Sequence, residues 1–131
     1  MSEKKKVLIA DDDFDILEQL KMQLQAEGFD VVACESQAEA ENQLETIKPD
    51  IAIFDLMMDD LDSGFVLSYK TKKKYPDVPV IIITAVTNET GLKFDVSTEE
   101  SKNWLKADVI LNKDIRFEQL FKEMNRLLGD N

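Results

Sequence analysis

Four aspartates stand directly after short apolar runs, where a change from strand to loop is expected. Asp11, Asp12 and Asp13 follow the first run, and Asp55 follows the third. Carboxylates that converge on one site repel one another unless a cation lies between them. Hard oxygen ligands suit Mg²⁺, which keeps part of its water shell and favours sites completed by phosphate oxygens. The pattern therefore predicts a metal-assisted phosphoryl site.

The elements that must position these acids are readable from the apolar runs. Each run is continuous rather than alternating, which is typical of strands covered on both faces in a parallel sheet. Segments with helical spacing separate the runs and predict a doubly wound α/β fold with helices on both faces. The expected strands are Val7–Ala10, Val31–Cys34, Ile51–Phe54, Val80–Ile83 and Val109–Leu111.

Helix boundaries are marked by capping residues. Asp13 can cap a first helix that ends before Gly28, and Ser36 with Glu39 forms a capping-box pair at the second. Between the fourth and fifth runs, a loop and a short helix near Trp104 are expected. The remaining predicted helices run from about 65 to 75, closed by Pro76, and from about 117 to 128, ended by Gly129.

In an open α/β sheet, ligands bind beyond the carboxyl ends of the strands. Thr84 follows the fourth run, and Lys113 lies two residues past the fifth. Singly, each such residue has a purely structural explanation, and Asp13 is predicted to be a helix cap rather than a ligand. Taken together with the acidic residues, Thr84 and Lys113 are expected at one edge of the sheet.

Composition excludes several classes of function. The chain has 131 residues and a net charge of −11, from 27 acids and 16 bases, with no histidine. Such an acid excess argues against nucleic acid and anionic membrane surfaces as partners. Cys34 is the one cysteine, and no stretch approaches the roughly 20 apolar residues of a membrane span. We expect a single cytoplasmic domain over 1–131, with its core at about 5–128 and no output domain.

Four motifs in order resemble the receiver domain of two-component response regulators. The resemblance covers nearly the whole chain, and it implies a flavodoxin-like sheet of order 2-1-3-4-5. The motifs are Ile9–Asp13, Ile53–Met58 followed by Gly64, Ile82–Ala85 and Leu111–Lys113.

The resemblance implies a role for each matching residue. Asp55 would accept a phosphoryl group from a sensor histidine kinase or a histidine phosphotransfer protein, in a reaction that needs Mg²⁺, with Mn²⁺ as an alternative. The chain would catalyse only its own phosphorylation and dephosphorylation, and it would signal to a downstream protein through a conformational change. Asp11, Asp12, Asp55 and the backbone carbonyl of Met57 would hold the metal, and Thr84, Ala85 and Lys113 would bind or admit the phosphoryl group.

The chain departs from the family pattern at several positions. Asp114 replaces the usual proline after the lysine, so the peptide is expected to be trans. Ile110 replaces the switch aromatic, Asp59 stands where proline is common, and the segment between Thr84 and Lys113 is longer than usual. The last feature is either a tolerated surface insertion or an altered docking surface.

Met57 carries a kinetic prediction. Its apolar side chain would lie beside the acyl phosphate and cannot orient an attacking water, so slow self-dephosphorylation is expected. Complete loss of the phosphoryl group within seconds would contradict this prediction.

Two alternative functions stay open at this point. A degenerate receiver that binds partners without phosphorylation would tolerate the changes at Ile110 and Asp114. A phosphohydrolase of the haloacid-dehalogenase type shares the D-x-D of Asp11 to Asp13, but it normally has Thr or Val where this chain has Asp15. An EF-hand reading fails because Ile16 occupies the glycine position.

Overall fold

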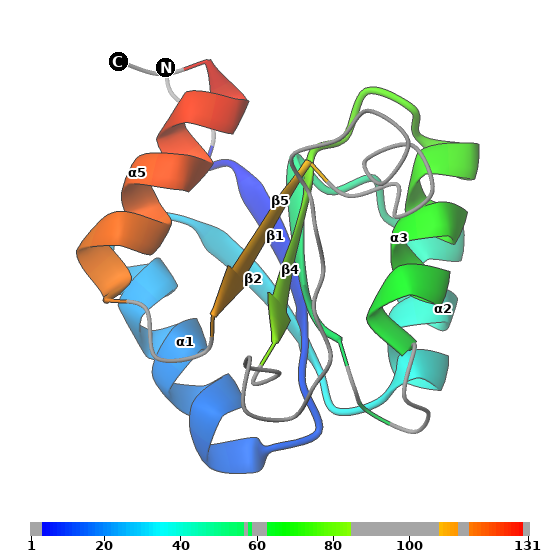
Figure 1. Cartoon of the computed structure of the whole chain (residues 1–131), viewed down its shortest axis with the longest axis horizontal. Coiled ribbons are helices and arrows are strands. Elements are labelled where there is room, and N and C mark those ends of the chain that lie inside the picture. Colours follow the sequence, from blue (N-terminus) through cyan, green and yellow to red (C-terminus); the bar gives the residue numbers. More distant parts are fainter. Residues whose placement is uncertain (1–3, 57, 59–62, 85–107, 113–115, 130–131) are drawn as a thin grey trace.

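The computed structural model describes residues 4–56, 58, 63–84, 108–112 and 116–129. These residues form five strands and four helices, and all five strands run parallel (Figure 1). The strands are β1 (Lys6–Ala10), β2 (Asp30–Cys34), β3 (Ile51–Asp55), β4 (Val80–Thr84) and β5 (Val109–Asn112). The helices are α1 (Phe14–Ala26), α2 (Gln37–Thr46), α3 (Ser63–Lys74) and α5 (Phe117–Leu128).

The strand order is β2-β1-β3-β4-β5, which confirms the predicted fold class. Helices α1 and α5 cover one face of the sheet, and α2 and α3 cover the other (Figure 1). Each strand that was predicted from an apolar run is present and is one residue longer, at the amino end in β1 and β2 and at the carboxyl end in β3, β4 and β5. Asp55 and Thr84 are therefore the last residues of their strands rather than the first residues of loops.

Two apolar clusters fill the space between the sheet and its helices. Residues alternate along each strand, so Ile51 and Ile53 face the α1–α5 layer, while Ala52 and Phe54 face the α2–α3 layer. Strands β3 and β4 are buried along their whole length. This two-sided burial is the physical reason that their sequences are continuous apolar runs.

The predicted caps of the first two helices are confirmed, with one difference in detail. The Asp13 side chain accepts hydrogen bonds from the backbone amides of Asp15 and Ile16 at the start of α1. At the start of α2, Ser36 accepts from the amide of Glu39 at 3.1 Å. The carboxylate of Glu39 accepts from the amide of Glu35 at 3.4 Å, one residue before the position that a capping box predicts.

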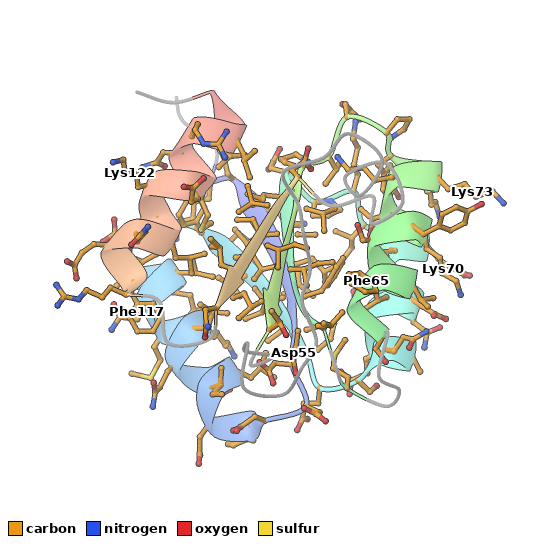
Figure 2. The ribbon with its side chains drawn as sticks, viewed as in Figure 1. Asp55, Phe65, Lys70, Lys73, Phe117 and Lys122 are labelled. Carbon is orange, nitrogen blue, oxygen red and sulfur yellow. The ribbon has the colours of Figure 1, made fainter. Side chains whose placement is uncertain are left out.

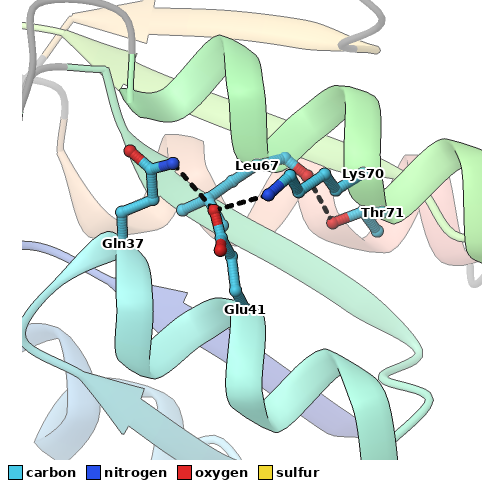
Figure 3. A network of polar contacts seen from close by, with 5 residues as sticks. All are labelled: Gln37, Glu41, Leu67, Lys70 and Thr71. Carbon is cyan, nitrogen blue, oxygen red and sulfur yellow. Dashed lines mark hydrogen bonds and ion pairs between the residues drawn. The ribbon is translucent and has the colours of Figure 1, made fainter.

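Helices α2 and α3 are connected by polar contacts across their outer surfaces. Glu41 accepts from Gln37 at 2.8 Å and pairs with Lys70 at 3.0 Å (Figure 3). The hydrogen bond from Gln37 has the largest effect on the Glu41 carboxyl, followed by that from Lys70, and both lower its pKa from the usual value. Tyr75 donates to the carbonyl of Leu44 at 2.9 Å, near the end of α2. The α2–α3 layer is thus linked at several points along its length.

Some expected features lie outside the described residues. They include the short helix near Trp104 and the geometry of the Lys113–Asp114 peptide. Within the described ranges, no helix combines the length and apolar composition that crossing a membrane requires.

Candidate functional site

Three of the predicted site residues come together at the carboxyl end of the sheet. One carboxylate oxygen from each of Asp11, Asp12 and Asp55 lies within 4.8 Å of the other two. Asp11 and Asp55 are buried, and Asp12 is exposed. Figure 2 shows Asp55 at the edge of the sheet, beside the start of α1. Asp12 and Asp55 are 43 positions apart along the chain, so the predicted convergence of distant acidic residues is present.

Asp11 is held by the turn that joins β1 to α1. Its backbone amide donates to the carbonyl of Cys34 at 3.1 Å, which continues the pairing between β1 and β2 by one residue. Its Oδ1 accepts from the amide of Asp13 at 2.8 Å. Asp13 in turn uses its own carboxylate to cap α1. The same short turn therefore begins the helix and fixes the direction of the Asp11 carboxylate.

Asp55 is held by the centre of the sheet. It ends β3, between β1 and β4, and its Cα pairs with that of Ile83. The amide of the following residue, Leu56, donates to the carbonyl of Ile83 at 2.9 Å. By strand alternation, Asp55 belongs to the face of Ile53, which is the α1–α5 face. The central strand thus presents a carboxylate at a position with little freedom to move.

The donor set fits a hard divalent cation. All three groups offer carboxylate oxygens, which are ligands that Mg²⁺ prefers, and two of them are buried. Like charges held this close disfavour one another without a cation between them. The one exposed carboxylate leaves room for the water molecules that Mg²⁺ tends to keep. Receiver domains typically bind Mg²⁺ through acidic residues of this kind.

Thr84 lies on the neighbouring strand at the same edge. It is buried and ends β4, where its Cα pairs with that of Asn112 at the end of β5. By alternation, Thr84 shares the face of Ile82, which is the α2–α3 side of the sheet. Lys113 follows Asn112 directly in the sequence. The predicted roles of Met57, Ala85 and Lys113 fall outside the described residues.

Ile110, at the position of the family's switch aromatic, is described. It is partly buried and packs against the cluster on the α2–α3 face of the sheet.

Two backbone groups at this site were missed by sequence reasoning. They are the carbonyl of Cys34 and the amide of Asp13, which together position Asp11. Backbone groups have no sequence signature, and only the register of β1 against β2 could have indicated the Cys34 carbonyl. The Cys34 thiol itself is buried, and this burial, with the nearby Glu39 charge, raises its pKa to about 12. The thiol is therefore neutral at physiological pH and a poor nucleophile.

Comparison with known proteins identifies the family. Residues 7–125 match the model of the response regulator receiver domain, and the chain belongs to this family. Accepting a phosphoryl group is the function of the family.

The curated relatives are two-component response regulators. The chain is 43% identical over 79 residues to the transcriptional regulatory protein GlrR of Escherichia coli K12, covering 60% of this chain and 18% of that protein. It is 32% identical over 85 residues to the alkaline phosphatase synthesis regulator PhoP of Bacillus subtilis, covering 65% and 35%. The aligned part of the chain therefore spans about a fifth to a third of the length of these relatives.

Solved structures of receiver domains share the fold. A CheY-like receiver domain protein from Methanospirillum hungatei superposes with a TM-score of 0.82 at 24% identity, covering 97% of this chain and 95% of that one. The response regulator TrrA of Thermotoga maritima, solved in complex with Mg²⁺ and BeF, gives a TM-score of 0.76 at 26% identity, covering 94% and 98%.

Proposed function

We propose that this receiver domain accepts a phosphoryl group on Asp55 in a reaction that requires Mg²⁺ held by Asp11, Asp12 and Asp55. One observation carries the proposal: the three carboxylates lie within 4.8 Å of one another at the carboxyl end of a parallel sheet. That edge is where ligands of open α/β folds bind. The complex of TrrA with Mg²⁺ and BeF, in a protein 26% identical to this one, supports the same choice of metal.

The proposed reaction is a single in-line transfer. A carboxylate oxygen of Asp55 attacks phosphorus in a phosphohistidine or a small acyl phosphate. A new O–P bond forms while the P–N or P–O bond to the donor breaks, and the leaving group departs with that electron pair. The carboxylate is ionised at neutral pH, so no general base is needed. The absence of histidine from the chain is therefore consistent with the role of acceptor.

The remaining residues position groups and neutralise charge, which is most of what phosphoryl transfer asks of a protein. Bound Mg²⁺ would supply positive charge beside the phosphoryl oxygens. In this proposal, the backbone carbonyl of Met57 adds a ligand, and Lys113 pairs with Asp55 and then with a phosphoryl oxygen. The Thr84 hydroxyl donates a hydrogen bond to the phosphoryl group, and the small Ala85 leaves space for it.

The proposal extends to partners and location. Response regulators interact with histidine kinases and downstream targets. We expect a sensor histidine kinase or a histidine phosphotransfer protein as donor, a protein as downstream target, and the cytoplasm as location. The chain would act on no other substrate. The net charge of −11 supports a protein partner rather than nucleic acid or an anionic membrane.

The proposal is tested by intact-mass spectrometry after incubation with acetyl phosphate. Wild type and Asp55→Asn are compared, each with Mg²⁺ and with chelator. We expect one phosphate adduct on wild type in Mg²⁺, and none with chelator or in Asp55→Asn. If wild type shows no adduct although it binds Mg²⁺ and a control receiver is labelled, the domain works as an interaction module without phosphorylation.

A further inference from the structure

Gly64, in the first turn of α3, touches the backbone that carries Asp55. A Cβ placed on Gly64 would lie 2.7 Å from the carbonyl oxygen of Asp55 and 2.7 Å from the Cα of Leu56. Both neighbours are backbone atoms, which cannot rotate away as the tip of a side chain can. The first turn of α3 lies at the same end of the molecule as Asp55 (Figure 2). No side chain fits between the helix and the end of β3.

Hydrogen bonds fix the same short piece of backbone from two sides. The amide of Gly64 donates to the carbonyl of Leu56 at 2.7 Å, and the amide of Leu56 donates to the carbonyl of Ile83 at 2.9 Å. Leu56 is thus held between α3 and β4 immediately after Asp55. Gly64 and the neighbouring Ser63 are buried. The position of the Asp55 main chain therefore depends on how closely α3 approaches.

The other described glycines serve a different purpose. Gly28 and Gly129 have φ of +97° and +81°, a left-handed conformation that favours glycine, and a Cβ on either would meet nothing within 4 Å. Gly64 has no such backbone angle, and what it requires is space. Among the described glycines, Gly64 alone is selected by contact with the candidate site.

We infer that Gly64 is a positioning residue for the acceptor Asp55. Because Gly64 has no side chain, α3 packs directly against the Asp55–Leu56 backbone. This contact sets the position of the Asp55 carboxylate relative to Asp11 and Asp12. The inference rests on the proposed function for its kinetic readout but not for its metal-binding readout. An added methyl group must move either α3 or the end of β3. Changes in the groups that orient metal ligands typically weaken metal affinity by about tenfold or more.

The matched test compares Gly64→Ala with Gly28→Ala. Both variants gain one methyl group, and Gly28→Ala loses stability through its backbone angle, at the opposite end of α1 from the acidic residues. Mg²⁺ affinity is measured by calorimetry, and phosphorylation by acetyl phosphate is followed by intact mass, at a temperature where circular dichroism shows each variant folded. We expect Gly64→Ala to bind Mg²⁺ about tenfold more weakly and to react about tenfold or more slowly, with Gly28→Ala close to wild type.

A second measurement needs no variant and covers the case in which Gly64→Ala does not fold. Wild type labelled with ¹⁵N only at its four glycines gives four backbone amide signals. Titration with Mg²⁺ should shift the Gly64 signal and leave those of Gly28 and Gly129 in place. A Gly64 signal that does not move while calorimetry reports binding would overturn the inference.

The outcomes separate the inference from the proposed function. Equal Mg²⁺ affinity and equal rates for the two folded alanine variants would overturn the role of Gly64 and leave phosphorylation of Asp55 intact. A wild type that binds Mg²⁺ but is never phosphorylated would overturn the proposed function. In that event, weaker Mg²⁺ binding by Gly64→Ala would still support the positioning role.

Discussion

Three of the described aspartates at each end of the sheet make contacts of opposite kinds. At the carboxyl end the carboxylates lie within 4.8 Å of one another. At the amino end each carboxylate lies against an amide or an ammonium group of a neighbouring strand or helix. The first set is Asp11, Asp12 and Asp55, and the second is Asp30, Asp50 and Asp108.

The contacts at the amino end have a structural purpose. Asp108, just before β5, accepts from the amide of Val80 at 2.8 Å and pairs with Lys72 of α3 at 2.8 Å. Asp50 accepts from the amide of Lys6 at 2.7 Å, and Asp30 lies 4.0 Å from the ammonium group of the same lysine. These bonds tie strand starts to neighbouring strands and to a helix.

The difference shows how a structural acid is distinguished from a functional one. Residue type does not separate the two sets, whereas position does, because the first set ends or follows strands and the second begins or precedes them. The two sets also differ in arrangement, since three carboxylates gathered within 4.8 Å of one another repel until a cation binds, whereas those at the amino end bond to groups of neighbouring strands and of a helix. The comparison therefore predicts opposite responses to Mg²⁺ and to neutralisation.

The largest expected effect is that of Mg²⁺ on stability. A cation that binds only the folded state at 100 times its dissociation constant raises the free energy of unfolding by about 2.7 kcal/mol. We expect thermal unfolding of wild type to show this gain and Asp12→Asn to lose most of it. Asp30→Asn is the matched control, with the same change at the other end of the sheet.

Equal Mg²⁺-dependent gains in the free energy of unfolding for Asp12→Asn and Asp30→Asn would contradict the comparison between the two ends of the sheet. Such a result would place the cation away from the acidic cluster. Without Mg²⁺, Asp12→Asn should be at least as stable as wild type, because it removes one of three like charges.

An intermediate effect is expected from Asp108→Ala. The backbone of Val80 is buried, so its amide loses an acceptor that water replaces poorly, at a cost of about 1–3 kcal/mol. Urea denaturation measures this loss. Mg²⁺ affinity of the folded variant should equal that of wild type, and a marked fall in affinity would mean that the two ends of the sheet are coupled.

The smallest effect is expected from Asp30→Asn itself. Its contact with Lys6 is long, at 4.0 Å, and both side chains are exposed to solvent. Exposed pairs of this kind contribute from zero to about 1 kcal/mol, so urea denaturation should detect a change of about 0.5 kcal/mol or less. A loss of stability as large as that of Asp108→Ala would show that solvent exposure does not predict the contribution of an ion pair at this end of the sheet.

Much of the fold was predictable because strands that are buried on both faces of the sheet have continuous apolar sequences. The convergence of Asp12 with Asp55 was predictable for a related reason, since parallel strands bring their carboxyl ends to one edge. The caps at Asp13 and Ser36 were also predictable, because their side chains act on amides only two or three residues away.

Contacts between elements were not predictable in the same way. The bond from Lys72 to Asp108 depends on how α3 packs against the start of β5, and the space required at Gly64 depends on how α3 meets β3. Neither leaves a local pattern of residue types. The roles of Asp55, Thr84 and Lys113 remain predictions for a further reason, because they concern reactivity rather than shape.

The division of the apolar residues into two clusters has a consequence for how this chain tolerates mutation. Leu17 of α1 belongs to one cluster and Leu67 of α3 to the other, with the sheet between them. Two sites that share no neighbours contribute independently, so the stability losses of Leu17→Ala and Leu67→Ala should add within about 0.5 kcal/mol in the double variant. Substitutions can then accumulate on one side of the sheet without restricting those allowed on the other, and each layer is free to diversify separately.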